Sequence, residues 1–204
     1  MNYLAFGAHP DDLEIGMGGT LAKLAANKKN NVTGVIATLS SQESERKQEQ
    51  INAAQILGIE IELLEIDFHK LFSSRFMVKT IDNLIEKYKP DVIFTHWNHD
   101  SHQDHNVLTD GVIAATRKNK CSVFMYEQTL PGGVVTESFR AQAYVDITGF
   151  IEKKIDSVDA HKTQISKNNK WWLNGIKGRA MYRGNQIGIE YAEAFEVIKL
   201  IKPF

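Results

Sequence analysis

Two short segments of this 204-residue sequence bring histidines and carboxylates together. The first is His9-Pro10-Asp11-Asp12, and the second is the stretch 96–105, which holds four of the seven histidines of the chain. Crowded carboxylates and imidazoles are unfavourable on their own, but a divalent cation makes such a cluster favourable. Catalytic zinc typically has three His or Asp/Glu ligands and keeps a fourth position for water. The segments therefore predict a metal centre in which His9 and Asp12 supply two ligands and a histidine of the second segment supplies the third.

Two other interpretations of the first segment, a dinucleotide-binding turn and a solvated helix-capping turn, account for fewer of the observed residues. A dinucleotide-binding turn needs G-x-G-x-x-G, whereas the turn 7–12 contains a proline, which removes an amide donor, and two carboxylates, which repel phosphate. A solvated turn that caps the following helix explains the aspartates, but neither His9 nor the second segment. His96 and His99 are expected in a loop or around the ligands, with His99 also a candidate for substrate binding.

The hydrophobic pattern predicts the elements that position these segments. Apolar runs predict strands at 2–8, 32–39, 59–66, 91–96 and 121–126, and the stretches between them predict helices at 16–28, 43–57, 76–88 and 106–117. Such alternation is typical of βαβ units that build a parallel sheet covered by helices on both faces. With the strand order 3-2-1-4-5, the first and fourth strands are neighbours where the order reverses, and ligands bind in the crevice there. Both polar segments follow these two strands, so we expect them to face one crevice.

The rest of the chain extends this α/β, Rossmann-like fold. We expect a strand at 141–147, a helix at 149–165, a loop at 166–170 and a short final helix at 190–198. Gly16, Gly18 and Gly19 are interpreted as letting the first helix pack closely on the sheet. Trp171-Trp172 fits either an apolar platform for a sugar ring or a core or subunit contact. No repeat or linker divides the sequence, so one domain over residues 1–204 is predicted.

Composition excludes several classes of function. With 24 Lys+Arg against 25 Asp+Glu, the formal charge is −1 and the pI about 6.7, so no global field would gather nucleic acid or an anionic membrane. The single cysteine, Cys121, can form neither an internal disulfide nor a thiolate zinc site. The apolar amino-terminal run stops at His9, too early for a signal peptide or a membrane span. A cytoplasmic protein without membrane insertion is expected.

Three motifs resemble those of the LmbE/PIG-L superfamily of zinc-dependent N-deacetylases, which act on N-acetylated amino sugars. They are Ala8-His9-Pro10-Asp11-Asp12, His102-Gln103-Asp104-His105, and the stretch from Arg183-Gly184 to Tyr191-Ala192-Glu193-Ala194-Phe195. Together they extend over nearly the whole chain. The resemblance is closest to the bacterial branch that includes the bacillithiol-pathway deacetylase, and it implies an LmbE-like sheet.

This resemblance also implies roles for the residues of the two segments. The zinc ligands would be His9, Asp12 and His105. Asp11 would be the general base on the metal-bound water, His102 the general acid, and Asp104 the residue that holds the imidazole of His102 in its tautomer. The chemistry agrees, because zinc lowers the pKa of its water to about 7, a carboxylate can take the proton, and a protonated histidine can give one to the leaving amine. Two imidazoles and one carboxylate also suit other divalent ions such as Fe²⁺.

Substrate-binding residues are implied less completely. The family's Thr-x-Gly-Glu and Arg-x-x-Glu correspond to 40–43 and 46–49, which keep Glu43 and Arg46 but lose the glycine. Glu43 is expected to accept hydrogen bonds from sugar hydroxyls, and Arg46 to contact a substrate oxygen or carboxylate. Arg183 and Tyr191 are candidates for lining the pocket, although the pattern around Tyr191 also fits simple packing.

The sequence thus predicts a metal-dependent hydrolase that removes an N-acetyl group from a small GlcNAc-type derivative. Its cofactor is Zn²⁺ or another divalent metal such as Fe²⁺, and its partner is a small amino-sugar substrate, with no nucleic acid. Homo-oligomers are frequent in the family, so self-association is a further expectation. Two alternatives stay open: an amidase or esterase acting on a non-sugar substrate, and a non-catalytic sugar-binding protein with an inherited metal pocket.

Overall fold

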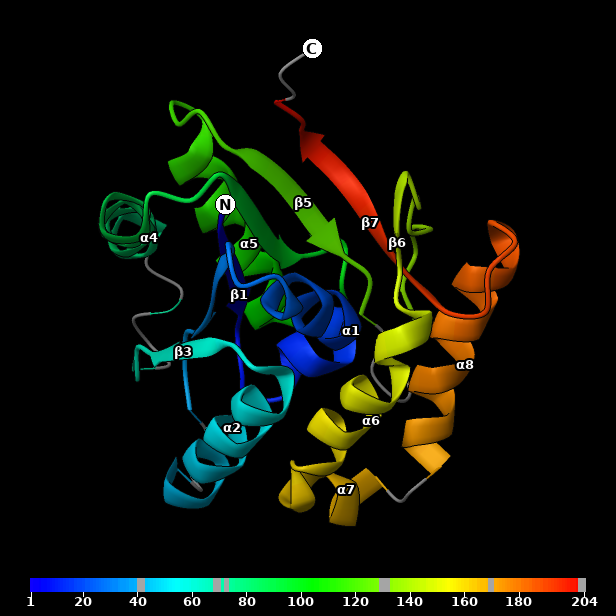
Figure 1. Ribbon diagram of the computed structural model, residues 1–204. Coiled ribbons are helices and arrows are strands. Elements are labelled where there is room, and N and C mark those ends of the chain that lie inside the picture. The colour runs from blue at the N-terminus through cyan, green and yellow to red at the C-terminus, as the bar shows by residue number, and fades with distance from the viewer. Residues whose placement is uncertain (40–42, 68–70, 72–73, 129–132, 169–170, 202–204) are drawn as a thin grey trace.

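A seven-stranded sheet forms the centre of the computed structural model, which describes residues 1–39, 43–67, 71, 74–128, 133–168 and 171–201 (Figure 1). The strand order is β3-β2-β1-β4-β5-β7-β6. The first five strands are parallel, and β7 runs antiparallel to both β5 and β6. The predicted order 3-2-1-4-5 is therefore confirmed, and β7 and β6 extend the sheet. The strands are β1 (Asn2–Gly7), β2 (Asn31–Ile36), β3 (Glu60–Leu63), β4 (Val92–His96), β5 (Ser122–Tyr126), β6 (Ala143–Asp146) and β7 (Ala192–Lys199).

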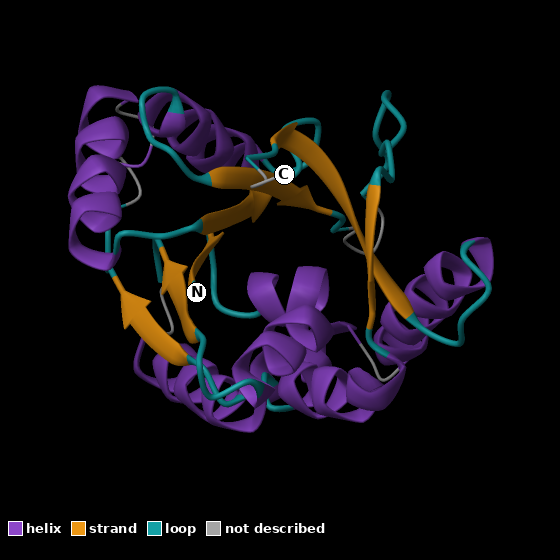
Figure 2. Ribbon diagram, turned by 45° about the horizontal axis from the view of Figure 1, so that its top comes forward, coloured by secondary structure: helices purple, strands orange, loops and turns teal. Residues whose placement is uncertain are grey.

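Helices cover both faces of this sheet (Figure 2). One face carries α4 and α5, and the other carries α1 and α2, with α6 beside them. This mostly parallel α/β architecture confirms the predicted fold class. The helices are α1 (Asp12–Ala26), α2 (Glu43–Leu57), α4 (Ser74–Tyr88), α5 (Gln103–Thr116), the short 3₁₀ helix η1 (Thr148–Phe150), α6 (Ile151–Asp159), α7 (Lys162–Asn168) and α8 (Trp171–Gln186).

Strand β1 shows why the central strands are apolar throughout. Leu4 and Phe6 belong to the core under α4 and α5, whereas Ala5 belongs to the core under α1. Successive side chains of a strand point to opposite faces, so a strand covered on both faces has no polar side. The apolar run at 2–8 therefore predicted a buried strand correctly.

Helix α1, which begins at the first polar segment, packs very closely on its neighbours. A Cβ atom at Gly16 would lie 2.3 Å from the ring of Tyr126, and one at Gly19 would lie 2.7 Å from Ile147. A larger residue at Gly16 would push the helix away from the sheet, so the predicted role is confirmed for Gly16. Gly19 instead faces Ile147, just beyond β6, and Gly18 faces Lys154 and Ser157 of α6.

The carboxyl-terminal third differs from the prediction. The predicted final helix at 190–198 is wrong, because Ala192–Lys199 forms strand β7 between β5 and β6. Its Ala- and Glu-containing sequence has no strong strand preference, and pairing along both edges decides its conformation. The predicted helix at 149–165 is divided into η1, α6 and α7, and α7 extends into the predicted loop at 166–170. Helix α8 was not predicted, since its glycines lower helix propensity.

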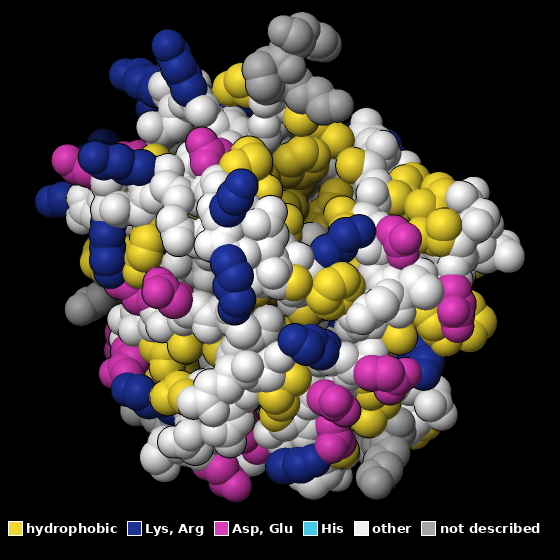
Figure 3. All heavy atoms as spheres, in the orientation of Figure 1, with side chains coloured by type: hydrophobic (Ala, Val, Ile, Leu, Met, Phe, Trp, Pro, Cys, Tyr) yellow, Lys and Arg dark blue, Asp and Glu magenta, His cyan; other side chains and the backbone are white. Residues whose placement is uncertain are grey.

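The described helices and the face drawn in Figure 3 bear on membrane-spanning character and surface charge, respectively. Among the described residues, no helix combines the length and the apolar character needed to cross a bilayer. On the face drawn in Figure 3, basic and acidic side chains are both spread among apolar and neutral groups. This distribution agrees with the formal charge of −1.

Candidate metal centre

Two strand-to-helix turns form the candidate site side by side. Strands β1 and β4 are paired in parallel, so their carboxyl ends lie at the same edge of the sheet. After β1 the chain turns at Asp11, which has a left-handed φ of 95°, and enters α1 at Asp12. After β4 it turns through 97–102 and enters α5, where His102 is the N-cap. The two polar segments therefore meet at one edge of the sheet, as expected, and each one spans the turn between its strand and the start of its helix.

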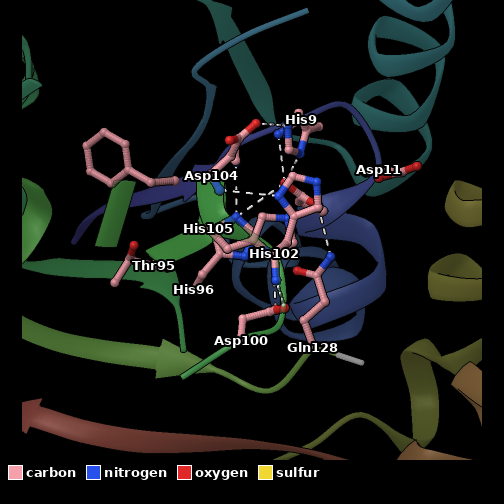
Figure 4. Close-up of polar contacts among 12 residues, drawn as sticks. His9, Asp11, Thr95, His96, Asp100, His102, Asp104, His105 and Gln128 are labelled. Atoms are coloured by element: carbon pink, nitrogen blue, oxygen red, sulfur yellow. Dashed lines mark hydrogen bonds and ion pairs between the residues drawn. The ribbon is translucent and has the colours of Figure 1, made fainter. Parts of the chain in front are cut away.

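Asp12 contacts three imidazoles of the cluster, and Figure 4 shows His9, His96, His102 and His105 gathered together. Its Oδ1 is 3.3 Å from His105 Nε2, and its Oδ2 is 3.2 Å from His96 Nε2 and 3.6 Å from His9 Nδ1. The side chain is 2% exposed. Asp12 also accepts hydrogen bonds from the backbone N–H of His9 at 2.7 Å and from Gln128 Nε2 at 2.8 Å. These contacts fix one carboxylate between three imidazoles.

The carboxylates determine the charge of two of these histidines. Burial disfavours a charged His9, but hydrogen bonds to Asp104 and Asp12 raise its pKa to about 9. Burial also disfavours a charged His105, yet Asp12 and Asp100 raise its pKa to about 10. Burial would raise the pKa of Asp12, whereas His105 and His96 hold that pKa well below its ordinary value. The cluster thus stabilises positive charge where the two turns meet, as a divalent cation site must.

Two sets of three residues have ligand atoms close enough to hold one metal ion. They are His9, His102 and His105, and Asp12, His96 and His105, with the ligand atoms of each set within 4.8 Å of one another. The predicted ligands are His9, Asp12 and His105. His9 belongs to the first set, Asp12 belongs to the second set, and His105 belongs to both. Nitrogen and carboxylate oxygen donors of this kind fit zinc, iron and related divalent ions. The donor set therefore fits the predicted group, and it does not select between the metals.

His96 is more closely involved in the cluster than the sequence analysis expected, because it belongs to one of the two metal-compatible sets. It ends β4, is fully buried, and its Nε2 accepts a hydrogen bond from the backbone N–H of Ala8 at 3.0 Å. Burial and the neighbouring His105 lower its pKa to about 4, so the ring stays neutral. His99, in contrast, is exposed and rests near Trp97.

The expected contact between Asp104 and the His102 imidazole is wrong. The Asp104 carboxylate lies 2.8 Å from His9 Nε2, while the backbone N–H of Asp104 donates to His102 Nδ1 at 3.2 Å. His102 caps α5, so its ring accepts an amide of the first turn and the side chain of Asp104 turns to the other loop. His102 is consequently oriented by the backbone, and Asp104 orients His9.

Asp11 and Arg46 are paired with each other. Arg46 Nη2 is 3.3 Å from Asp11 Oδ2 and also donates to the carbonyl of Pro10, so Arg46 holds the turn instead of presenting a free guanidinium. Burial raises the pKa of Asp11 to about 6. Figure 4 shows the Asp11 side chain pointing away from the histidines. Glu43 begins α2, and its side chain lies outside the described part of the structure.

Two residues at the cluster were missed by the sequence analysis. Asp100 Oδ2 is 2.9 Å from His105 Nδ1, the ring nitrogen opposite the one that faces Asp12. Gln128, which follows β5, reaches Asp12 from the next strand. Asp100 lies inside the histidine-rich segment, and Gln128 lies just beyond the next strand at the same edge. Both positions could have been found by extending the strand-end argument.

A pocket of about 550 Å³ adjoins the cluster through Asp100 and Gln128. Arg183 lines this pocket. Tyr191 does not line it, because its side chain packs with Ile147 and Ile151 in a small apolar cluster, as a residue just ahead of β7. Trp172 packs in another small core cluster, and Trp171 is exposed.

Comparison with known sequences identifies the family. The family described as "PIG-L: GlcNAc-PI de-N-acetylase" matches residues 4–116. The chain belongs to this family. It is 33% identical to "Uncharacterized deacetylase YaiS" of Escherichia coli over 125 residues, which cover 56% of this chain and 67% of that protein. It is 26% identical to "Diacetylchitobiose deacetylase" of Thermococcus kodakarensis over 215 residues, with coverage of 93% and 80%.

Solved structures share the fold. The N,N'-diacetylchitobiose deacetylase of Pyrococcus horikoshii matches with a TM-score of 0.81 and 25% identity, covering 100% of this chain and 87% of that one. GalB, the 4-carboxy-2-hydroxymuconate hydratase of Pseudomonas putida KT2440, matches with a TM-score of 0.82 and 18% identity, covering 100% and 99%. Because a hydratase has the same fold, the fold by itself does not define the reaction.

Proposed function

We propose that this protein is a metal-dependent hydrolase that removes the N-acetyl group from a small GlcNAc-type amino-sugar derivative. The observation that carries the proposal is the convergence of His9, Asp12 and His105 at the carboxyl ends of β1 and β4. Family membership and the named deacetylases among the relatives support this reaction over others. The cluster comes from residues between His9 and Gln128 and the pocket also uses α8, which supports a single functional domain over residues 1–204.

We assign the metal to His9, Asp12 and His105, with Zn²⁺ or another divalent ion such as Fe²⁺ as the cofactor. When bound, such an ion polarises a carbonyl and lowers the pKa of its water. Asp104 and Asp100 each contact the second ring nitrogen of a ligand histidine, His9 and His105 respectively. Contacts of this kind fix the tautomer and orientation of a ligating imidazole.

Asp11 is the proposed general base. Its pKa of about 6 suits a group that must be ionised near neutral pH and still accept a proton from water. Since its carboxylate faces Arg46, this role requires the side chain to turn towards the histidines. Until the side chain rotates, the positive charge of Arg46 would keep the Asp11 carboxylate ionised.

His102 is the proposed general acid. Its Nδ1 accepts the backbone N–H of Asp104, so the neutral ring carries its proton on Nε2. Burial and the nearby His9 and His105 lower the pKa of His102. A proton taken up during the reaction is therefore released readily to the leaving amine.

The test measures acetate release from a set of N-acetylglucosamine derivatives by purified, metal-saturated protein. We expect turnover that stops with a chelator and returns with zinc. Replacing Asp11 by Asn should lower kcat about 10²–10⁴-fold, because a general base contributes that much, while metal content stays the same. Full activity of Asp11→Asn would refute the assigned base. Metal binding and tight sugar binding without acetate release would instead identify a non-catalytic binding protein.

A further inference from the structure

Helix α1 begins in an unusual way, because the side chain of its N-cap residue does not cap it. Asp11 holds the N-cap position, yet within α1, all of which the structure describes, its carboxylate accepts no hydrogen bond from the first turn. An aspartate at this position ordinarily accepts a backbone N–H two or three residues on. The Asp11 carboxylate instead lies 3.3 Å from Arg46 Nη2. The proposed general base is therefore not engaged in capping its own helix.

The backbone of Asp11 needs support that its own side chain does not give. Its φ of 95° lies in the left-handed region, which residues other than glycine rarely adopt. The residue is buried, and the N–H of an N-cap residue has no partner within its helix. A buried backbone N–H without a hydrogen bond is unfavourable. A residue from another element must therefore accept this N–H and hold the turn.

Gln50 of α2 supplies this support. Its Oε1 accepts the backbone N–H of Asp11 at 3.1 Å, and its Nε2 donates to Glu14 Oε1 at 2.7 Å. Because an N–H needs an acceptor and a carboxylate needs a donor, these two contacts fix the orientation of the amide. Glu14 is the third residue of α1, the position from which a glutamate reaches back to the N-cap N–H in a capping box. Gln50 thus bridges the two ends of a capping box that do not meet directly.

Helix α2 holds the peptide group between Pro10 and Asp11 at both of its polar atoms. Gln50 accepts its N–H, and Arg46 donates to its carbonyl oxygen. Arg46 and Gln50 are four residues apart, so they lie on the same face of α2. Two contacts on one planar peptide group fix its orientation, and with it the φ of Asp11. They leave rotation about the Cα–Cβ bond of Asp11 possible, which the proposed role of its carboxylate requires.

Gln50 is itself held in place. Its side chain is fully buried, as is that of Glu14 at the other end of the bridge. The adjacent Glu49 accepts hydrogen bonds from the backbone N–H and the Oγ1 of Thr163 in α7, both at 2.7 Å. Helix α2 is therefore tied to a second helix directly beside the contact with the turn.

We propose that Gln50 is a positioning residue that holds the backbone turn at Asp11, so that the carboxylate of this general base can reach the attacking water. This inference rests on the proposed deacetylase function and adds a residue to its machinery. The metal ligand Asp12 has supports of its own, namely the backbone N–H of His9 and the side chain of Gln128. Loss of the Gln50 contacts should therefore impair the base more than the metal site.

The first experiment replaces Gln50 by Met, which keeps the length of the side chain and removes both hydrogen bonds. With the N-acetylglucosamine derivative that is deacetylated fastest, we expect kcat to fall about 10–100-fold, because a small displacement of a catalytic group has an effect of this size. KM and metal content should stay within about twofold of their original values, since the lost interaction serves the transition state. Gln48→Met, the same change at an exposed position of α2, is the control and should leave all three quantities unchanged.

The second experiment exchanges the two ends of the bridge. Gln50→Glu alone places two buried carboxylates next to each other and should lower kcat about tenfold or more. When Glu14→Gln is added, the amide at position 14 can donate to the carboxylate at position 50, which can still accept the Asp11 N–H. We expect the double variant to recover at least about tenfold in kcat over Gln50→Glu, a coupling that independent sites do not show. This comparison also decides the case where Gln50→Met does not fold.

A kcat of Gln50→Met within about threefold of the original, a metal content that falls in parallel with kcat, or a double variant without recovery would overturn the inference while leaving deacetylation in place. Absence of acetate release from the original chain would refute the proposed function instead. Hydrogen exchange of the Asp11 amide then decides whether Gln50 holds the turn. Exchange about tenfold or more faster in Gln50→Met than in Gln48→Met would support the hold, and equal exchange would overturn it.

Discussion

Two buried ionic clusters meet the first turns of α1, and they differ in how their charges are balanced. In one, Lys154 Nζ donates to the carbonyls of Glu14 and Ile15 at 3.0 and 2.8 Å and to Glu193 Oε1 at 2.6 Å. Glu193 also accepts the backbone N–H groups of Gly19 and Thr20. This pair is satisfied within the chain, and its contacts tie α1 to α6 and β7.

The metal centre is balanced differently. Carboxylates from both turns surround the imidazoles, ligand atoms of two three-residue sets converge, and the buried His96 Nδ1 and Gln128 Oε1 have no hydrogen-bond partner among the described residues. A cluster with converging ligand atoms is suited to take up an ion, whereas the Lys154–Glu193 pair is suited to hold elements together. Variants of the metal centre should therefore lose metal and activity, whereas variants of the Lys154–Glu193 pair should lose folding stability.

The largest effect is expected for His105→Ala, because His105 belongs to both metal-compatible sets. Metal content should fall from about one ion per chain to nearly none, and kcat/KM should fall at least about a thousandfold, since the activated water is lost. Metal analysis after gel filtration and acetate release measure the two effects. His99→Ala, a change of the exposed histidine in the same segment, is the matched control and should keep the metal. Retention of stoichiometric metal by His105→Ala would contradict the assignment.

The variant Lys154→Met should affect folding rather than metal binding. Removing one partner of a buried ion pair leaves the other charge unbalanced and destabilises a protein by about 3–5 kcal/mol. Chemical denaturation gives this free energy of unfolding, with the exposed Lys153→Met as control. The fraction that stays folded should bind metal with unchanged affinity. A weakened metal affinity with normal stability would show that the two clusters are not separate in function.

The two clusters also differ in how well they can be predicted from the sequence. The convergence of the histidine and carboxylate residues was predictable because they lie in two contiguous segments that directly follow the neighbouring strands β1 and β4. The Lys154–Glu193 pair joins α6 to β7 across 39 positions, and no local pattern marks it. Strand β7 itself was mistaken for a helix, since only its pairing with β5 and β6 makes it a strand. The partner of Asp104 was also beyond reach, because His9 and His102 lie on different loops whose relative position the sequence does not specify.

Asp100→Asn offers a finer test of the metal centre. The Asp100 carboxylate contacts His105 Nδ1, and removal of its charge should weaken the hold on that imidazole. Changes to such supporting carboxylates typically lower metal affinity about 10–100-fold. Competition with a fluorescent chelator measures this affinity, and Asp110→Asn, at an exposed position of α5, is the control. An unchanged affinity would contradict a supporting role of Asp100 at His105.

The smallest effect concerns a histidine outside the metal centre. His161 is fully buried, and its Nε2 lies 3.6 Å from Glu14 Oε2. Burial opposes charge on the ring, but Glu14 and Asp11 outweigh burial and the repulsion from Arg46, so the pKa of His161 is raised above its ordinary value of 6.5. The stabilisation from this raised pKa is fully present below pH 6.5 and is lost as the pH rises through the folded-state pKa.

Unfolding free energies of the original chain and of His161→Gln should therefore differ most in mildly acidic solution and converge towards alkaline pH. Using the difference between the two proteins cancels the titration of the groups that His161 does not influence, whereas the titration of Asp11 stays in the difference. In a background of Glu14→Gln the pH dependence of this difference should become smaller, because the nearer negative partner is gone and only Asp11 remains. A difference that stays constant or grows with pH would show that His161 is buried as a neutral ring, and that its contact with Glu14 contributes no protonation-linked stability.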